Sequence, residues 1–216
     1  MLPKWYICFM YIPEYFELKD QEQILNFLEQ HPFGSLAVNG PDGFPVVAPV
    51  PFSCEFAGEK KFLEFHVAKQ NPVVEALLES GKGKFIVTGA HGYISSSVYT
   101  HVNVPTYNYE TVHVSGKISE LTPVELKHHL ARLVDAFEKD REQPLHFGQW
   151  PESLMDSYVA EIKGYRIAIG KLEAAFKLSQ NRNETDFNRI IQDLLTRTSG
   201  DRNLAETMKQ HQCPIQ

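Results

Sequence analysis

"VPTYNYETVHVSG", residues 104–116, is the segment that says most about the fold. In an extended strand, successive side chains point to opposite faces of the sheet. One face then carries rings and hydrogen-bonding groups: Tyr107, Tyr109, Thr111 and His113. The other face begins polar and ends in valines: Asn108, Glu110, Val112 and Val114. The tyrosines could stack on a planar ligand, although the preference of tyrosine for strands explains them equally well.

The segments around this strand predict an antiparallel sheet with helices at its corners and ends. Apolar or alternating runs predict strands at 34–39, 44–53, 60–68, 84–90, 108–121 and 162–178. Capped amphipathic runs predict helices at 21–30, 71–80, 122–140, 184–197 and 202–211. Because strands and helices do not alternate, a doubly wound sheet is disfavoured. The order instead predicts a mainly β (α+β) fold: a small six-stranded antiparallel barrel with peripheral helices and a C-terminal helical hairpin.

Composition narrows the class of function. The chain has 216 residues, of which 43% are hydrophobic and 22% charged, with a net charge of -6. A negative net charge disfavours broad electrostatic attachment to DNA. Three distant cysteines, Cys8, Cys54 and Cys213, predict neither a disulfide framework nor a zinc site, so a cytoplasmic location is expected. The apolar run at residues 5–12 is too short for a membrane span and lacks a cleavage site, which disfavours a signal peptide and a membrane role.

Catalytic motifs such as GxSxG, HExxH and the P-loop do not occur, and no metal site is expected. One short stretch, "HVAKQNP" at 66–72, joins a strand to a helix start. His66, Lys69 and Gln70 supply donors, and the helix start is expected to offer free backbone N–H groups. Such a corner suits a phosphate, while a plain capped turn with a surface lysine is the alternative.

Two further stretches carry polar groups at strand ends. "GAHGYISSSVY", 89–99, combines flexible glycines with hydroxyls and rings, although a simple flexible loop is an equal interpretation. "FKLSQNR", 176–182, gathers two cations and three neutral polar side chains, which can hold a phosphate and a polar ring edge together. A solvated strand end is the alternative there. Together with residues 104–109, these stretches predict one polar, aromatic, phosphate-binding pocket.

Six motifs, in order, resemble those of the PaiB-type FMN-binding proteins. They are "MYIPEYF" (10–16), "PFGSLAV" (32–38), "HVAKQNP", "GYISSSVY" (92–99), "VPTYNY" (104–109) and "FKLSQNR", and the resemblance covers nearly all of residues 10–210. It implies a flavin-reductase-like split β-barrel that binds FMN at the interface of a homodimer. It also implies a domain from 10 to 180, preceded by an extension at 1–9 and followed by a helical segment at 181–216.

The resemblance also implies the site. His66, Ala68, Lys69 and Asn71 would hold the phosphate and ribityl chain of FMN. The pocket walls would come from Tyr93, Ser95, Tyr107, Asn108 and Tyr109. Lys177, Ser179 and Gln180 would enter from the last strand, of the same chain or of its partner. Catalytic residues are not implied.

Departures from the family pattern bear on affinity. The family has Arg-Ala where this chain has Lys69-Gln70, and Trp where it has Tyr107. Where the family has a lysine before Phe-Lys, this chain has Ala174-Ala175. One lost charged hydrogen bond to a phosphate costs about 1.5–3 kcal/mol, which is about 10- to 150-fold in affinity. FMN binding weaker than is typical of the family is therefore expected.

Three functions remain open. The resemblance implies a negative transcriptional regulator, a flavin-dependent oxidoreductase, or both in one protein. Direct DNA binding would use Arg189, Arg197, Arg202 and Lys209 of the C-terminal helices, but nearby carboxylates offset these charges. A haem-binding or haem-degrading split barrel is the alternative, and it would need an axial histidine that the sequence does not single out.

Overall fold

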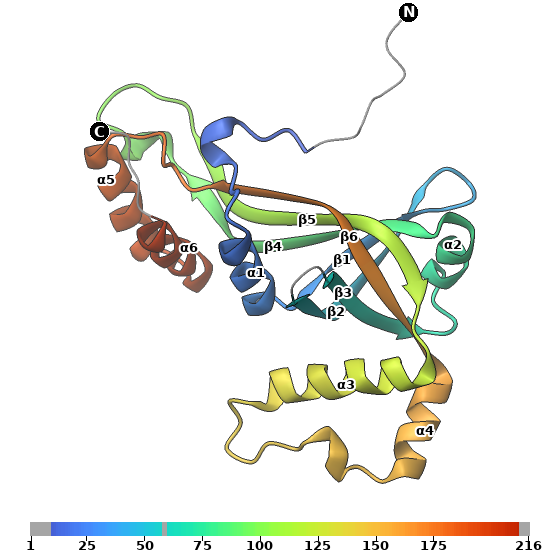
Figure 1. Ribbon diagram of the computed structural model, residues 1–216. Helices are drawn as coiled ribbons and strands as arrows, with labels where there is room; N and C mark the ends of the chain where they lie inside the picture. Colours follow the sequence, from blue (N-terminus) through green and yellow to red (C-terminus); the bar gives the residue numbers. More distant parts are fainter. Residues whose placement is uncertain (1–9, 58–59, 212–216) are drawn as a thin grey trace, which may run out of the picture. The chain divides into compact units, whose positions relative to one another are not determined.

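The computed structural model describes residues 10–57 and 60–211 (Figure 1). The chain forms a closed antiparallel ring of strands in the order β1-β2-β3-β6-β5-β4, which confirms the predicted six-stranded barrel. Its described residues divide into two compact units, a larger unit within 21–87 and 112–172, and a smaller unit of residues 10–20, 88–111 and 173–211. The predicted extension at residues 1–9 lies outside the described residues.

The larger unit holds three complete strands and the adjoining parts of three longer ones. The complete strands are β1 (Phe33–Asn39), β2 (Pro45–Ala57) and β3 (Lys60–Ala68). The longer strands are β4 (Lys82–Ile94), β5 (Thr106–Glu120) and β6 (Ile162–Lys177). The helices of this unit are α1 (Gln21–Gln30), α2 (Val73–Ser80), α3 (Pro123–Glu138) and α4 (Glu152–Glu161).

The barrel core follows from the alternation of the strands. Leu36, Phe52, Phe65 and Phe85 are at most 1% exposed, and the Phe85 ring contacts the rings of both Phe52 and Phe65. Burial of such side chains supplies most of the driving force for folding.

The register of β3 against β6 runs from Phe62 opposite Ala168 to Ala68 opposite Ile162.

The prolines of β2 were expected where their missing N–H is not needed. Pro45, Pro49 and Pro51 all lie in the part of β2 that pairs with β1, whereas β3 pairs with Phe52–Ala57. A proline is tolerated where one edge of its strand makes no ladder. The pairing is therefore consistent with the sequence expectation.

The helix boundaries are set by local chemistry. Thr122 and Glu125 form a reciprocal capping box at the start of α3. α2 ends at Gly81, whose φ of 57° is the left-handed conformation that favours glycine. The start of α3 and the end of α2 both agree with the sequence prediction to within two residues.

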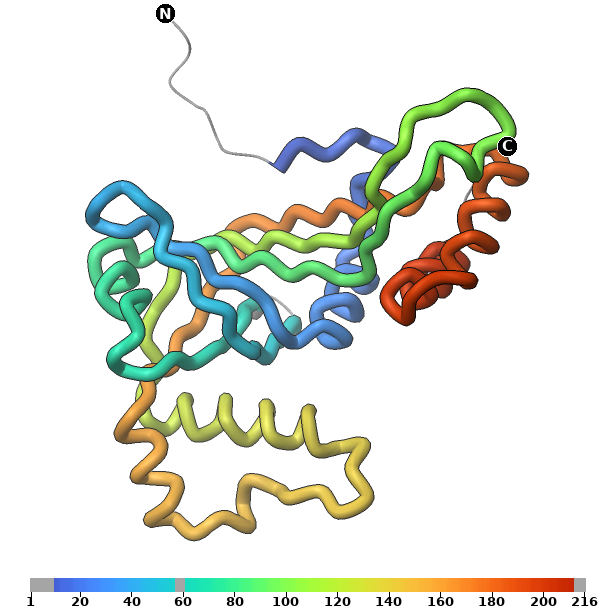
Figure 2. Tube along the Cα trace, turned by 180° about the vertical axis from the view of Figure 1, so that it is seen from behind, coloured from blue at the N-terminus to red at the C-terminus, as the bar shows by residue number. Residues whose placement is uncertain are grey.

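The smaller unit contains the ends of β4, β5 and β6 with two helices, α5 (Glu184–Leu195) and α6 (Ser199–Gln210). These two helices pack against each other as the predicted hairpin, and Figure 2 shows them beside the loop between β4 and β5. Residues 17 and 18 add to the edge of β6, since Glu17 bridges Ala175 and the Leu18 N–H donates to the Ala174 carbonyl at 3.1 Å. Within the described part of the chain, no helix has the length and apolar character that a bilayer span requires.

Candidate functional site

The twelve predicted FMN contacts are divided between the two units. His66, Ala68, Lys69 and Asn71 belong to the larger unit. The other eight belong to the smaller unit: Tyr93, Ser95, Tyr107, Asn108, Tyr109, Lys177, Ser179 and Gln180. Each group is described within its own unit.

The strand–helix corner after β3 is tightly hydrogen-bonded to itself. The Asn71 side-chain oxygen accepts from the Val73 N–H at 3.0 Å, and the Asn71 carbonyl accepts from the Val74 N–H at 2.9 Å. The Asn71 N–H donates to the Ala68 carbonyl at 3.0 Å. The helix start therefore offers fewer free N–H groups than the sequence predicted. The exposed Lys69 remains available to an anion, because only its backbone N–H is bonded here, to the Glu161 carbonyl at 3.0 Å.

His66 is half-buried and belongs to a chain of hydrogen bonds beneath α3. Its Nδ1 lies 3.1 Å from Nε2 of His129, and Nδ1 of His129 lies 3.0 Å from the Ser53 hydroxyl. Burial lowers the pKa of His66 below 6.5. Burial, together with His66 and Arg132, lowers the pKa of His129 to about 3. Both rings are therefore neutral at pH 7.

Beside this pair, a buried carboxylate binds two guanidinium groups. Glu64 of β3 is completely buried and contacts both Arg132 of α3 and Arg166 of β6. Arg166 also lies 3.1 Å from Glu125. Sequence reasoning missed this cluster, although Glu64 stands between the core residues Leu63 and Phe65, and a charge in such a run is a signal of pairing.

In the smaller unit, four rings lie on the exposed side of adjacent strands, and we call them the tyrosine face: His91, Tyr93, Tyr107 and Tyr109. Tyr93 and Tyr107 are 48% and 49% exposed. The His91 and Tyr107 rings are stacked with centroids 6.1 Å apart. Large exposed rings are available to a ligand or a partner, since folding has not buried them.

One core-facing residue of β5 and two residues that follow β6 make contacts within the chain instead. Asn108 is 0% exposed, and its side-chain amide donates to the Ser179 hydroxyl at 2.9 Å. Ser179 has a φ of 63°, a strained conformation for a residue other than glycine. Gln180 turns back on its own chain, accepting from the Leu178 N–H at 2.7 Å and donating to the Phe176 carbonyl at 2.5 Å. These three side chains brace the end of β6.

Two other predicted contacts are also engaged locally. The Lys177 ammonium donates to the Thr106 hydroxyl at 2.5 Å and lies over the Phe16 ring. Ser95 accepts from the Ser97 N–H at 3.2 Å and caps the short helix that follows. Ala175, where the family has a lysine, is 1% exposed beneath its bridge to Glu17. A lysine side chain at position 175 would therefore be buried at its base in this structure.

Glu110 is a second buried carboxylate, which the sequence did not single out. It is 4% exposed, and its carboxylate accepts from the Ala90 N–H at 3.1 Å. Burial raises the pKa of Glu110 to about 7, against the opposing effect of that hydrogen bond. His211 lies 3.9 Å away, and burial lowers the pKa of its imidazole.

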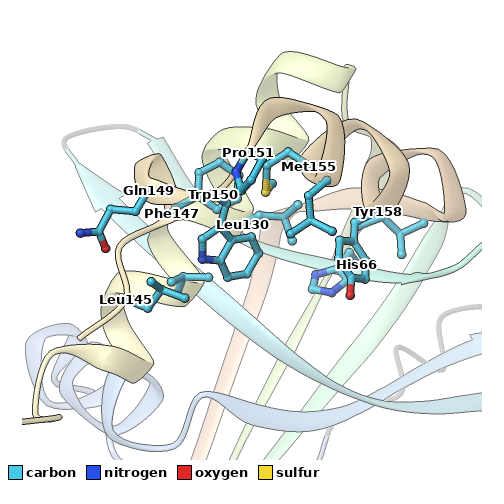
Figure 3. Close-up of a pocket in the computed structure, with 12 residues that line it drawn as sticks. His66, Leu130, Leu145, Phe147, Gln149, Trp150, Pro151, Met155 and Tyr158 are labelled. Carbon is cyan, nitrogen blue, oxygen red and sulfur yellow. The ribbon is translucent and has the colours of Figure 1, made fainter. Parts of the chain in front are cut away.

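Each unit contains a cavity. The cavity of the larger unit has a volume of about 620 Å³ and lies among α3, residues 145–151 and α4 (Figure 3). Its lining is apolar except for His66, Gln149, Trp150 and Tyr158. A cavity of about 290 Å³ in the smaller unit is lined by Phe16, Phe176, Gln180 and His211 among others. In the described part of the chain, His, Cys, Asp and Glu side chains do not gather in threes around a metal position.

The ring of strands and the structures it resembles define a split β-barrel fold. A solved FAD- and haem-binding protein from Mycobacterium smegmatis superimposes with a TM-score of 0.58 at 20% identity, covering 74% of this chain and 73% of that one. A flavocytochrome from Azotobacter vinelandii gives 0.56 at 17% identity, covering 77% and 72%. At these identities the likeness shows the fold alone.

Sequence comparison defines the family. Residues 10–171 match the family model described as "Putative FMN-binding domain". The chain is 36% identical over 185 residues to the Bacillus subtilis protein named "Protease synthase and sporulation protein PAI 2", covering 86% of this chain and 89% of that protein. This chain belongs to the PaiB-type FMN-binding family. Lys177, Ser179 and Gln180 lie beyond the matched range.

Proposed function

We propose that this protein binds FMN and works as a flavin-dependent redox protein in the cytoplasm. The observation that carries the proposal is the match of residues 10–171 to the FMN-binding family. FMN, when bound, supplies one- and two-electron transfer chemistry, while the protein binds and orients it.

The residues that are exposed fit the parts of FMN. In the larger unit, the exposed Lys69 offers an ammonium group to a phosphate. In the smaller unit, the tyrosine face offers rings on which a flat ring system can stack. Asn108, Ser179 and Gln180 bond to one another and to the local backbone, so we assign them a positioning role behind the site. Under this proposal, these three of the twelve expected FMN contacts do not touch FMN but hold the residues that do.

Titration of the purified protein with FMN and with riboflavin tests the proposal. Riboflavin lacks the phosphate, so it isolates the contribution of Lys69. We expect Lys69→Ala to weaken FMN binding about 10-fold or more while leaving riboflavin binding unchanged. Lys117→Ala, an exposed lysine of β5, is the matched control and should behave as wild type. A protein that stays colourless with both flavins would overturn the proposal.

We further propose a homodimer as the binding form, because the exposed rings of the tyrosine face form a surface that a second copy could cover. Sedimentation of the purified protein with and without FMN tests this. A monomer at all concentrations, with or without FMN, would contradict it.

A regulatory role is the second candidate, and the name of the Bacillus subtilis relative, a sporulation protein, supports it. Direct DNA contact through α5 and α6 is less well supported, because three of the four cations proposed for it bond within the hairpin, while Arg189 is exposed. Arg197 pairs with Asp193, Arg202 donates to the Arg197 carbonyl, and Lys209 pairs with Glu206. A gel-shift assay at low salt with the upstream DNA of the encoding gene tests direct binding, and retardation there would restore it.

Haem binding remains a third candidate, because His66 lines an apolar cavity of about 620 Å³. Haem titration with detection of a Soret band tests it. If His66 is the axial ligand, His66→Ala should remove the shift of the Soret band that binding produces.

A further inference from the structure

The cavity among α3, residues 145–151 and α4 is built like a small-molecule site. Its volume of about 620 Å³ falls in the range of ligand pockets. A neighbouring hollow of about 350 Å³ shares His66, Leu130 and Trp150 with it. This feature lies wholly in the larger unit and is independent of the predicted FMN contacts other than His66.

The walls select an apolar ligand. Leu130 and Val134 come from α3, Phe147 from the connecting segment, and Met155 from α4. Leu154 and Tyr158 also line the cavity although they are 42% and 57% exposed. Apolar side chains that line a cavity and reach solvent gain free energy when a ligand covers them.

Trp150 adds a buried hydrogen-bond donor without an acceptor among the described residues. Its indole Nε1 is buried, and it has no hydrogen-bond partner among the described residues. Buried donors are almost always paired, because an unpaired one has lost its water without compensation. Trp150 lines both hollows, as Figure 3 shows for the larger one. An acceptor atom on a bound molecule would satisfy this N–H.

His66 provides a second polar group, in a defined state. The Glu64 carboxylate lies 4.0 Å from Nδ1 of His129 and favours a proton there. Nε2 of His129 then accepts from the Nδ1–H of His66, which leaves Nε2 of His66 as an acceptor. Lysine and arginine do not occur among the lining residues, all of which the structure describes. The cavity therefore disfavours carboxylates and phosphates.

We propose that this cavity binds a neutral aromatic molecule whose carbonyl or hydroxyl oxygen accepts a hydrogen bond from Trp150 Nε1. The site stands whether or not the protein binds FMN elsewhere.

Three naphthalenes of matched shape test the proposal on the full chain by calorimetry. 2-Acetylnaphthalene carries the acceptor, 2-isopropenylnaphthalene replaces its oxygen with carbon, and 2-naphthoate adds a negative charge. We expect the acetyl compound to bind about 3- to 10-fold more tightly than the isopropenyl compound, and the naphthoate to bind most weakly. Equal binding of the first two would overturn the role of Trp150, and tightest binding of the naphthoate would overturn the proposal.

Variants locate the site. Trp150→Phe should bring the acetyl and isopropenyl compounds to equal affinity while retaining both. Val134→Trp should fill the cavity and abolish binding, whereas Val124→Trp on the same helix, at a 64% exposed position, should leave binding unchanged. If Val134→Trp does not fold, Leu154→Lys at the exposed rim serves instead, and it should raise naphthoate affinity above that of the isopropenyl compound. Unchanged binding in Val134→Trp or in Leu154→Lys would place the ligand elsewhere and overturn the proposal.

Competition separates this site from the cofactor sites. Saturating FMN should leave binding of 2-acetylnaphthalene unchanged. Haem should also leave it unchanged, because this proposal assigns the cavity to the aromatic molecule in place of the haem candidate described above. Loss of binding on addition of either would show that the cavity belongs to that cofactor, which would overturn the proposal but not FMN binding itself. Binding that weakens as protein concentration rises would show that a second copy covers the cavity, and would also overturn it.

Discussion

Single residues in this protein were predictable where they obey an alternation and unpredictable where they depend on contacts distant in sequence. In β5 most of the expected alternation is observed, with Asn108, Val112 and Val114 buried and Tyr107 exposed, whereas Thr111 is buried although it was expected on the face of Tyr107. The sequence does not reveal that Asn108 meets Ser179, because 71 residues separate them. Ser179 and Gln180, which follow β6, and Asn108 of β5 were predicted as ligand contacts, and in the structure all three make hydrogen bonds within the chain.

Glu110 gives a prediction about stability and pH. With a pKa of about 7 against an ordinary value of 4.5, folded Glu110 retains a proton that the unfolded chain has lost between these pH values. Its contribution to stability is full below pH 4.5 and is lost as pH rises through 7. Glu110→Gln keeps an acceptor for the Ala90 N–H and removes this loss. We expect the variant to be at least about 1 kcal/mol more stable than wild type at pH 8, but not at pH 4.5.

Urea unfolding at pH 4.5 and pH 8 measures this difference. Glu79→Gln, at an exposed position on α2, is the matched control and should follow wild type at both values. A Glu110→Gln profile parallel to that of wild type would show that the carboxylate is ionised in the fold at neutral pH. The buried His129 has the opposite sign, since its lowered pKa makes stability fall as pH drops from 6.5 towards 3.

At the scale of the elements, capping and periodicity predicted most helices and strands, and α4 was the exception. α1 begins and ends at the residues predicted, and α3 begins at its capping box. α4 (Glu152–Glu161) was not predicted because it buries only Met155 and has no regular apolar stripe. β4 also runs four residues further than predicted, through Ile94, since its glycines and His91 do not look like strand residues.

Asp186 fixes the loop between β4 and β5 to α5. Its completely buried carboxylate accepts from the Thr100 N–H at 2.8 Å and from the Asn183 side chain at 3.1 Å, and His101 lies 3.4 Å away. We expect Asp186→Ala to lower the free energy of unfolding by about 1–3 kcal/mol, because the Thr100 N–H and the Asn183 side chain lose a charged acceptor. Glu184→Ala, an exposed carboxylate in the same turn, should cost less than about 0.5 kcal/mol.

Urea unfolding measures both variants, and hydrogen exchange should show faster exchange at Thr100 in Asp186→Ala alone. Equal stability of the two variants would indicate that the loop is held by other contacts.

Gly116 reflects a close approach of β5 and β6. A Cβ at this position would lie 1.8 Å from the Ala168 carbonyl oxygen, a distance that the backbone must relieve by moving. We expect Gly116→Ala to cost more than about 2 kcal/mol or to prevent folding. Gly148→Ala, where a Cβ would meet nothing within 4 Å, should be nearly neutral. Thermal unfolding of the two variants measures the contrast, and similar melting temperatures would mean that the strands separate easily here.

For the molecule as a whole, the fold and the family were predictable. The six motifs in order and the antiparallel pattern of strands can both be recognised in the sequence without knowing which residues are in contact. The twelve predicted FMN contacts stay a prediction. A site needs the directions of side chains, and the sequence does not show that Lys69 is free while Asn71 is consumed by its own helix. The cavity near α4 could not be predicted at all, since the helix that helps to line it was missed.

The prediction at this scale concerns linkage between ligand and fold. A ligand that binds only the folded protein at 100 times its dissociation constant adds about 2.7 kcal/mol of stability. We therefore expect saturating FMN to raise the melting temperature of wild type and Lys117→Ala, and to raise that of Lys69→Ala less at the same concentration. Differential scanning fluorimetry measures these shifts, and an equal shift in all three proteins would remove Lys69 from the site.

The half-buried indole of Trp150 has a practical consequence for measurements on this chain in solution. The sequence contains only two tryptophans, Trp5 and Trp150, so Trp5→Phe would leave a single emitter. That emitter lies in the segment between α3 and α4, and its colour and intensity depend on how much water surrounds it. The intrinsic fluorescence of Trp150 in this variant would therefore report the hydration of one known position without an attached dye.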